Sequence, residues 1–304
     1  MTPVCQSVRQ PESYSKSKTT NMKYFVIILF FSVICLEIHG REIIEEIIEP
    51  AILEIKYERR TVLDTLDMEN VFCKDLLTLK IGKTISAFYS AERKTSDSIE
   101  ERHPEARLRY SDNPDAWKRR ARLPNEKIFK NYPTGKLRIH DRFDLTNWSF
   151  DENLEKPEWT VSDSISNIMG YQCIFAETDF RGRHWEVWFT PEIPISDGPW
   201  KLWGLPGLIL SARDSKGHYT YHPVAIGSER IGNVEYYDYE AGSRLKTTRQ
   251  KALTHKWKSI HENIRDKIAA MGMIQFKNPS SSGKQLANHH DNYDFEEMDY
   301  PHQR

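Results

Sequence analysis

The chain has 304 residues, enough for one large domain or two small ones, and its 38% hydrophobic and 12% aromatic residues exclude a chain that is disordered throughout. Its 43 lysine and arginine residues nearly balance its 44 acidic residues. A protein that binds nucleic acid through its phosphates needs a basic stripe, so the composition argues against that class of function and we expect no nucleic-acid partner.

The N-terminal part of the sequence has the pattern of a secretory signal peptide. Lys23 precedes an apolar run over 24–36, and Gly40 supplies a small residue after it. The run is shorter than the about 20 apolar residues that span a bilayer. We therefore expect residues 1–40 to be a leader, with the signal peptide within 22–40, and the mature chain to be exported.

Short strand-like runs separated by turn residues follow the leader. Each pair of runs with a tight turn between them predicts a β-hairpin. The runs over 76–90 predict a hairpin or a bend at Gly82-Lys83. Further hairpins are predicted over 127–140, around Pro133-Thr134-Gly135; over 171–190, around Arg181-Gly182-Arg183; and over 208–224, around Asp214-Ser215-Lys216-Gly217. Repeated hairpins indicate a meandering antiparallel sheet. The charge-dense residues 91–124, interrupted by three prolines, are expected to form a long loop or a partial lid.

Near the C-terminus, apolar residues recur at helical spacing: Leu253, Trp257, Ile260, Ile264, Ile268 and Met271. Thr247 and Gln250 have the spacing of a capping box, and Gly272 marks the end. We expect this stripe to cover an open face of the sheet, with partner binding as the alternative. The predicted fold is α+β and mostly antiparallel β, a curved, meandering sheet, half-barrel or bowl-like, covered by one long C-terminal helix.

The domain predicted by these patterns spans residues 41–276. Residues 277–304 are polar and are expected to form a disordered tail. Within the domain, Cys73 and Cys173 are the two cysteines that remain after the leader, and neither belongs to a C-x-x-C pair, which argues against zinc-binding and thioredoxin-type chemistry. In an oxidising compartment we predict a structural disulfide between them, with two buried free thiols as the alternative.

Residues 158–210 carry the most distinctive sequence of the chain. They include the turn Arg181-Gly182-Arg183, the prefix Gly198-Pro199-Trp200 and the run Gly204-Leu205-Pro206-Gly207-Leu208-Ile209. In this order these features resemble the family of exported proteins named GLPGLI after that run. Leu79 to Lys83 and Phe88 to Ser90 look like the opening strands of the family, so the resemblance extends from about residue 50 to 225.

This resemblance implies a periplasmic or outer-membrane-associated protein of a diderm bacterium, in a family without an established biochemical activity. The pattern is also similar to bowl-shaped envelope domains, including a non-catalytic N-terminal domain of some bacterial peptide:N-glycanases. A likeness of fold does not fix a function.

The motif can be understood without a ligand, as a rigid crossover between strands. Its prolines remove backbone donors, its glycines permit positive φ, and Leu205, Leu208 and Ile209 would anchor it in the core. A binding site is the alternative interpretation, because aromatic platforms beside arginines can hold a sugar, an extended peptide or a lipid. The candidate binding residues are Arg181, Arg183, Trp185, Trp188, Trp200 and Trp203.

No sequence pattern of known catalytic chemistry is found, and we expect no catalytic residues, no metal site and no cofactor. The favoured function is therefore a non-catalytic binding or accessory module of the envelope, serving an outer-membrane transport or export system. One alternative is a hydrolase that uses carboxylates such as Glu177, Asp179 or Glu186, which requires at least one of them to be buried with a raised pKa. The other alternative is a structural or assembly protein.

Overall fold

The computed structural model describes residues 43–103, 123–143, 146–261 and 293–299; the predicted leader lies outside these ranges. The helices are α2 (Ala91–Arg102) and α5 (Arg249–His261), with the 3-10 turn η1 (Ala241–Ser243). The strands are β1 (Ile44–Pro50), β2 (Leu53–Val62), β3 (Phe72–Ile81), β4 (Ser86–Tyr89), β5 (Lys127–Lys130), β6 (Lys136–Phe143), β7 (Thr146–Asn153), β8 (Thr160–Ile168), β9 (Tyr171–Phe180), β10 (Arg183–Thr190), β11 (Leu208–Asp214), β12 (Tyr219–Gly227), β13 (Asn233–Asp238) and β14 (Arg244–Lys246).

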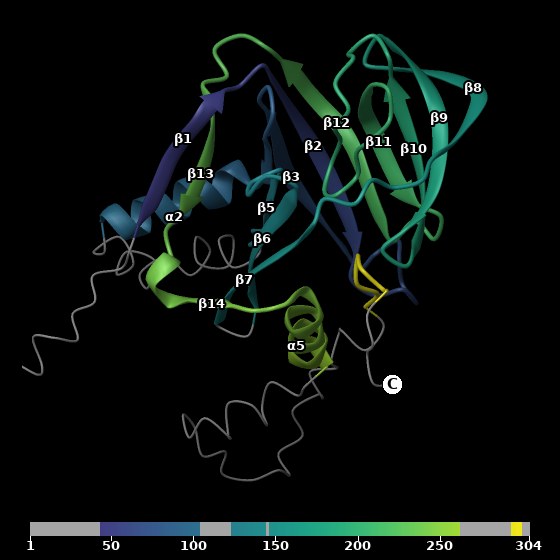
Figure 1. The fold of residues 1–304 in the computed structure, drawn as a ribbon. Helices are drawn as coiled ribbons and strands as arrows, with labels where there is room; N and C mark the ends of the chain where they lie inside the picture. Colours follow the sequence, from purple (N-terminus) through teal and green to yellow (C-terminus); the bar gives the residue numbers. More distant parts are fainter. Residues whose placement is uncertain (1–42, 104–122, 144–145, 262–292, 300–304) are drawn as a thin grey trace, which may run out of the picture. The chain divides into compact units, whose positions relative to one another are not determined.

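Twelve strands of the described ranges form one large sheet, in the order β14-β7-β6-β5-β4-β3-β2-β12-β11-β10-β9-β8. Strands β2 to β7 form one antiparallel meander and β8 to β12 a second, and the pairing of β12 with β2 joins them. Strand β14 runs parallel to β7 at one edge, so the sheet is mixed, and the two edge strands leave it unclosed. Strands β1 and β13 form a separate two-stranded sheet (Figure 1).

The predicted hairpins are confirmed by the strand pairing. Between β9 and β10 the chain turns at Arg181, with φ 54°, and Gly182, with φ 77°. Two successive residues with positive φ form the type of tight turn whose twist matches that of the paired strands. The local turn chemistry therefore sets the register of β9 on β10, which pairs Arg183 with Phe180.

Strand β10 separates two faces of the sheet. Four alternating positions of the strand are buried: Arg183, Trp185, Val187 and Phe189. The positions between them remain partly exposed: His184, Glu186 and Trp188. We call these the buried face and the outer face of the sheet. The buried face carries the main hydrophobic core, in which the Trp185 ring lies 5.4 Å from that of Trp200 and 6.4 Å from that of Tyr221.

The prediction of a sheet covered by one long C-terminal helix is wrong. In the described ranges the helix comprises the 13 residues of α5, which buries Ala252 and Leu253 and packs against β7 near one edge of the sheet. The later positions of the predicted stripe, Ile264, Ile268 and Met271, lie outside the described residues. The prediction failed because an apolar stripe identifies the face of a helix that packs, but it does not determine how much of a sheet that face covers.

The prediction of a loop over 91–124 is also wrong for its first part, which forms α2. The hydroxyl of Ser90 accepts a hydrogen bond from the backbone N–H of Arg93 and caps the helix, and Arg93 pairs with Asp97 at 2.8 Å one turn later. The charge-dense composition of this segment did not indicate a helix, because the contacts that stabilise α2 are polar. Neither α2 nor α5, the helices of the described ranges, has the length and apolar character needed to cross a membrane.

Candidate functional site

The loop between β10 and β11 crosses the buried face of the sheet and delivers Trp200 and Lys201 into the core, where both are fully buried. The backbone of Trp200 has a φ of 52° and that of Gly204 a φ of 102°. At Gly207 a Cβ atom would lie 2.2 Å from the carbonyl oxygen of Thr190, so only glycine fits there. The run from Gly204 to Ile209 thus closes the loop and leads into β11.

The structure separates the six candidate binding residues. Arg181 and Arg183 lie at the turn between β9 and β10, while Trp185 and Trp200 are fully buried in the core. Trp188 lies on the outer face, with its ring 5.3 Å from that of Phe175. Trp203 is partly exposed in the loop, where its indole N–H donates to the carbonyl oxygen of Glu155 at 2.9 Å. The two arginines and Trp200 remain together near one site.

Residues 293–299, which belong to the polar tail, lie against this site, and we call them the tail segment. Phe295 is buried, and the guanidinium of Arg183 donates to its carbonyl oxygen, with an Nε–O distance of 2.9 Å. Arg183 also pairs with Asp214 at 2.8 Å and lies 4.8 Å from the centre of the Tyr219 ring. The buried arginine is therefore held in position by the sheet and presents the rest of its donors to the tail segment.

Glu297 of the tail segment enters a buried cluster of charges. Its carboxylate lies 2.5 Å from the ammonium of Lys201 and 2.7 Å from Nε of Arg249. Glu152 of β7 contacts the same two cations, at 2.5 Å and 3.1 Å. Burial alone would raise the pKa of Glu297, but the charges of Lys201 and Arg249 lower it to about 2.

The two ends of the tail segment are also bound to the sheet. At one end the backbone N–H of Met298 donates to the carbonyl oxygen of Arg181 at 2.9 Å. At the other end the hydroxyl of Tyr219 contacts the Tyr293 hydroxyl at 2.7 Å and the carbonyl oxygen of Asp294 at 2.9 Å. Between them, the hydroxyl of Tyr221 donates to the carboxylate of Glu296.

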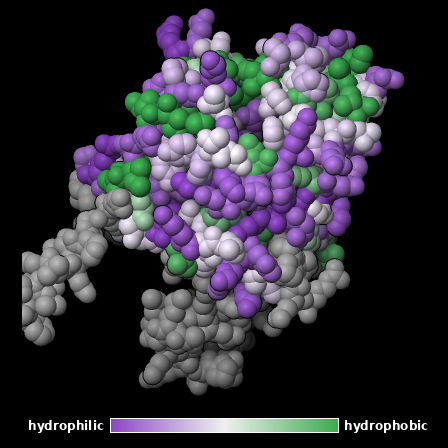
Figure 2. Space-filling view, viewed as in Figure 1, coloured by the Kyte–Doolittle hydropathy of each residue, from purple (hydrophilic) through white to green (hydrophobic). Residues whose placement is uncertain are grey.

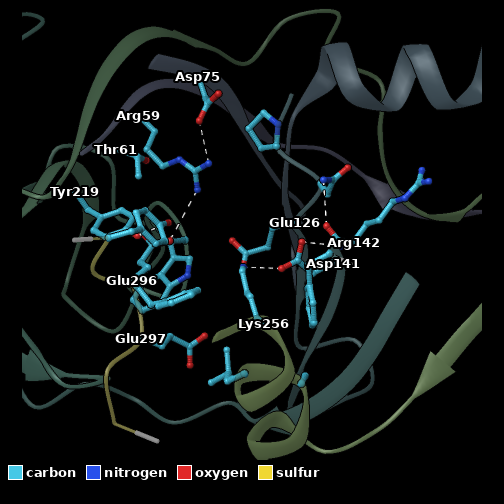
Figure 3. A pocket seen from close by; sticks show the side chains of 18 of the residues that line it. Arg59, Thr61, Asp75, Glu126, Asp141, Arg142, Tyr219, Lys256, Glu296 and Glu297 are labelled. Carbon is cyan, nitrogen blue, oxygen red and sulfur yellow. Dashed lines mark hydrogen bonds and ion pairs between the residues drawn. The ribbon is translucent and has the colours of Figure 1, made fainter. Parts of the chain in front are cut away.

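A cavity of about 300 Å³ lies beside the tail segment. Figure 3 shows Glu126, Asp141 and Lys256 on one side of it and Arg59, Tyr219 and Glu296 on the other. Its walls come from β2, β3, β6, β7, β12, α5, residues 124–126, the loop between β10 and β11, which we call the Trp200 loop, and the tail segment. The cavity is therefore assembled from distant parts of the chain. Aromatic rings contribute much of the wall: Phe143, Phe150, Trp200, Tyr219, Tyr293 and Phe295.

Most charges of the cavity already have partners. Arg59 lies 3.0 Å from Asp75 and 3.8 Å from Glu296, and Lys256 lies 2.6 Å from Asp141. Glu126 differs, because burial raises its pKa to about 7, an effect that Lys256 opposes and that Glu296 and Asp141 strengthen. Near neutral pH this carboxyl therefore holds a proton for part of the time.

Four buried polar atoms of the cavity residues have no hydrogen-bond partner among the described residues: Nε of Arg59, Oγ1 of Thr61, Nε1 of Trp200 and Oδ1 of Asn125. The two nitrogen atoms are donors, the asparagine oxygen is an acceptor, and the threonine hydroxyl can be either. A buried polar atom without a partner costs free energy, so each of these atoms requires water or a ligand.

The three carboxylates considered for a hydrolase lie away from this cavity. The side chains of Glu177 and Asp179 are 43% and 88% exposed, and both contact His184 on the outer face. Glu186 is 25% exposed and pairs with Arg213 at 2.6 Å. Within the described part of the chain, no group of histidine, cysteine and acidic side chains has the arrangement of a metal site.

The predicted disulfide is also absent from the structure, where Cys73 and Cys173 are free thiols. Cys73 lies on β3 and Cys173 on β9, and four strands separate β3 from β9 in the sheet. Neighbouring strands are about 4.8 Å apart, whereas the Cα atoms of a disulfide lie within about 7 Å of each other, so the strand order keeps these thiols apart.

The sequence interpretation missed the residues that build the cavity and hold the tail segment. Glu126, Lys201, Arg249 and Lys256 appear in the sequence as ordinary surface charges, and no motif distinguishes them. A signal was present in the tail, where Tyr293 and Phe295 stand two positions apart in a polar stretch. Aromatic residues at alternate positions indicate an extended segment with one packed face.

Comparison with known proteins adds a family match over a short region. Residues 175–211 match the family model described as "Protein of unknown function (Porph_ging)", which covers the second part of β9, all of β10, the loop and the start of β11. No curated protein matches the chain.

Two solved structures, described as "Structure of PNGF-II in P21 space group" and "Structure of PNGF-II in C2 space group", are similar to the chain at 15% and 16% sequence identity. The matches cover 70% and 68% of this chain and 34% and 33% of the other chains, with TM-scores of 0.45 and 0.44. The chain thus spans 34% or less of their length, and TM-scores this low support no conclusion about fold or function.

Proposed function

We propose that the mature chain is an exported, non-catalytic module that binds a small, neutral, polyhydroxylated ligand, such as a sugar ring, in the cavity beside the tail segment. The observation that carries this proposal is the set of buried donors and acceptors without partners in a cavity of about 300 Å³ with aromatic walls. This volume lies at the lower end of the range of small-molecule sites.

A neutral ligand fits the charges of the cavity better than a charged one. Arg59 and Lys256 are already paired with Asp75 and Asp141, so an anion or a cation would have to compete with these buried ion pairs. The raised pKa of Glu126 leaves that carboxyl partly neutral near pH 7. Most of the cavity atoms that still lack partners belong to uncharged side chains. The exception is Nε of Arg59, which belongs to a guanidinium that is already paired with Asp75.

Hydroxyl groups suit these atoms because each hydroxyl can both donate and accept a hydrogen bond. The same ligand can therefore accept from Trp200 and Arg59 and donate to Asn125, while its apolar edges pack on the aromatic walls. A lipid has less support. Figure 2 shows a mainly hydrophilic face on which hydrophobic side chains form separate patches and no continuous surface.

Isothermal titration calorimetry of the mature protein with glucose, galactose, mannose and their N-acetylated amino sugars tests the proposal. We expect binding of at least one of these sugars, and we expect Asn125→Ala to weaken it about tenfold because an acceptor is lost. Asn153→Ala, which changes an exposed amide of β7, is the matched control and should leave binding unchanged. If none of the sugars produces heat at millimolar concentration, the ligand class is wrong.

Export is the second part of the proposal. It is supported by the apolar run over 24–36 and by the resemblance of the 158–210 segment to the exported GLPGLI proteins. Together they favour a periplasmic or outer-membrane-associated accessory module of a transport or export system. After fractionation of cells that produce the untagged chain, mass spectrometry should find a mature N-terminus near Arg41 in the envelope fraction. Full-length chain confined to the cytosol would contradict it.

A further inference from the structure

The tail segment is bound as an extended peptide on a sheet that is complete without it. None of its residues belongs to a strand, and it follows α5 only after residues 262–292. Among the described residues, one backbone hydrogen bond joins it to the rest of the fold, from Met298 to Arg181. Its other contacts are made through side chains of the sheet, of the Trp200 loop and of α5.

Two anchor residues carry the tail segment. Phe295 and Glu297 are 4% and 5% exposed, whereas the residues on either side of each remain more exposed. Anchors at alternate positions are the pattern expected when an extended peptide places every second side chain into a site. The aromatic anchor contributes apolar burial, and the acidic anchor meets the buried Lys201 and the partly exposed Arg249.

Charge complementarity extends along the whole segment. Four of its seven residues are acidic: Asp294, Glu296, Glu297 and Asp299. The surface that receives them is rich in cations, of which Arg181, Arg183, Lys201 and Arg249 each contact the segment directly. Opposite charges arranged in this way select a partner and its register.

The fit at the turn between β9 and β10 is close. A Cβ atom on Gly182 would lie 2.7 Å from the backbone nitrogen of Asp299 and 2.8 Å from the carbonyl carbon of Met298. The glycine that the tight turn requires therefore also permits the backbone of the tail segment to approach.

From these contacts we infer that this surface is a recognition site for an extended acidic peptide with an aromatic–x–glutamate core, and that the tail segment occupies it in cis. A partner protein that presents such a peptide binds by displacing the tail segment. The cis segment competes for the site, so it lowers the apparent affinity for the partner and selects peptides that reproduce both anchors. This inference goes beyond the proposed function, because none of its contacts depends on a ligand in the cavity.

The experiment uses the full mature chain with a specific protease site in place of Ser280-Ser281-Ser282-Gly283. Cleavage leaves the tail segment on a separate fragment that is no longer tethered. A fluorescein-labelled synthetic peptide of residues 292–300 is then titrated, and its binding is measured by fluorescence anisotropy. We expect the cleaved protein to bind the labelled peptide at least about tenfold more tightly than the uncleaved protein does.

Variants of the peptide identify the anchors without any change to the protein. Glu297→Gln should weaken binding about 100-fold, because it leaves Lys201 and Arg249 facing a neutral group in a buried site. Phe295→Ala should weaken it at least about tenfold. Asp294→Asn is the matched control, with an effect below about threefold, because Asp294 is partly exposed and its partner Lys216 lies at the surface. Its other neighbour, His218 at 3.2 Å, has a pKa that burial lowers, so it is mainly uncharged at pH 7.

Two outcomes would overturn the inference. In the first, the cleaved fragment remains bound and does not exchange with the labelled peptide, so the segment is a permanent part of the fold. In the second, the fragment leaves and circular dichroism shows that the sheet unfolds, or the folded protein fails to bind the labelled peptide. None of these measurements involves sugar binding. A failure of this inference can therefore be distinguished from a failure of the proposed sugar binding.

Discussion

Lys201→Met is expected to lower the free energy of unfolding by about 3–5 kcal/mol, the range for breaking a buried ion pair by removing one partner. The ammonium of Lys201 is fully buried and lies 2.5 Å from both Glu152 and Glu297. Without it, the two buried carboxylates keep only the guanidinium of Arg249 and, beside Glu152 alone, that of Arg181 at 3.1 Å. Urea unfolding at pH 7, followed by circular dichroism, measures the change.

Two comparisons assign this loss to the buried charges. Lys74→Met removes a lysine that is 53% exposed and pairs with Glu58, and it should change stability by less than about 0.5 kcal/mol. Adding Glu297→Gln to Lys201→Met should restore part of the loss, because one carboxylate is then removed together with one cation, and Arg249 and Arg181 face Glu152 and Asp299. A Lys201→Met protein within about 1 kcal/mol of the parent would show that the cluster contributes little.

Glu126→Gln is expected to stabilise the protein at pH 8 by about 3 kcal/mol and to have little effect at pH 4. Burial raises the pKa of Glu126 from its ordinary 4.5 to about 7 in the folded protein. Because the folded state holds the proton more tightly, its contribution to stability is present below pH 4.5 and is lost as the pH rises through 7. Glutamine cannot ionise and avoids that loss.

The difference in unfolding free energy between the variant and the parent, measured at pH 4, 6 and 8, isolates Glu126 from other groups that titrate in this range. Its charged neighbours Lys256, Glu296 and Asp141 are the same in both proteins. Asn153→Ala, which changes an exposed amide of β7 that does not titrate, should give a difference that is independent of pH. A constant difference for Glu126→Gln would mean that this carboxyl is ionised as readily in the folded protein as in the unfolded one.

The pKa of Glu297 is shifted in the opposite direction, so this group affects stability in a different pH range. Lys201 and Arg249 lower its pKa to about 2, so its contribution to stability is present above pH 4.5 and is lost as the pH falls toward 2. The two glutamates therefore limit stability from opposite sides of neutral pH. The tail segment carries one of them and contacts the cavity that contains the other.

Local patterns in the sequence predicted the hairpins correctly, and the two faces of β10 follow from a local pattern of the same kind. The turn at Arg181-Gly182 and the alternation from Arg183 to Phe189 depend on residues within a few positions of each other, so they can be read without knowledge of the fold. Proline and glycine likewise indicated that the chain between β10 and β11 is not a strand.

The same patterns failed wherever a distant partner decides the result. The helical stripe predicted a long cover for the sheet, but α5 packs near the β7 edge only. The cysteine count predicted a disulfide, but the order of the strands places β3 and β9 far apart. Composition predicted a disordered tail for 277–304, and within it the tail segment has two buried anchors, Phe295 and Glu297.

The hairpins of the sheet, the glycines of its tight turns and the apolar face of its strands can be predicted from the residues alone, because they follow from backbone sterics and from the alternation of side chains. Which charges meet depends on the folded chain. Lys201, Glu152, Glu297 and Arg249 come from four separate segments, and they converge because β12 pairs with β2 and brings the two meanders together. Such convergence depends on long-range pairing, which local patterns do not encode, so the cavity and the tail-binding surface could be found only in the folded chain.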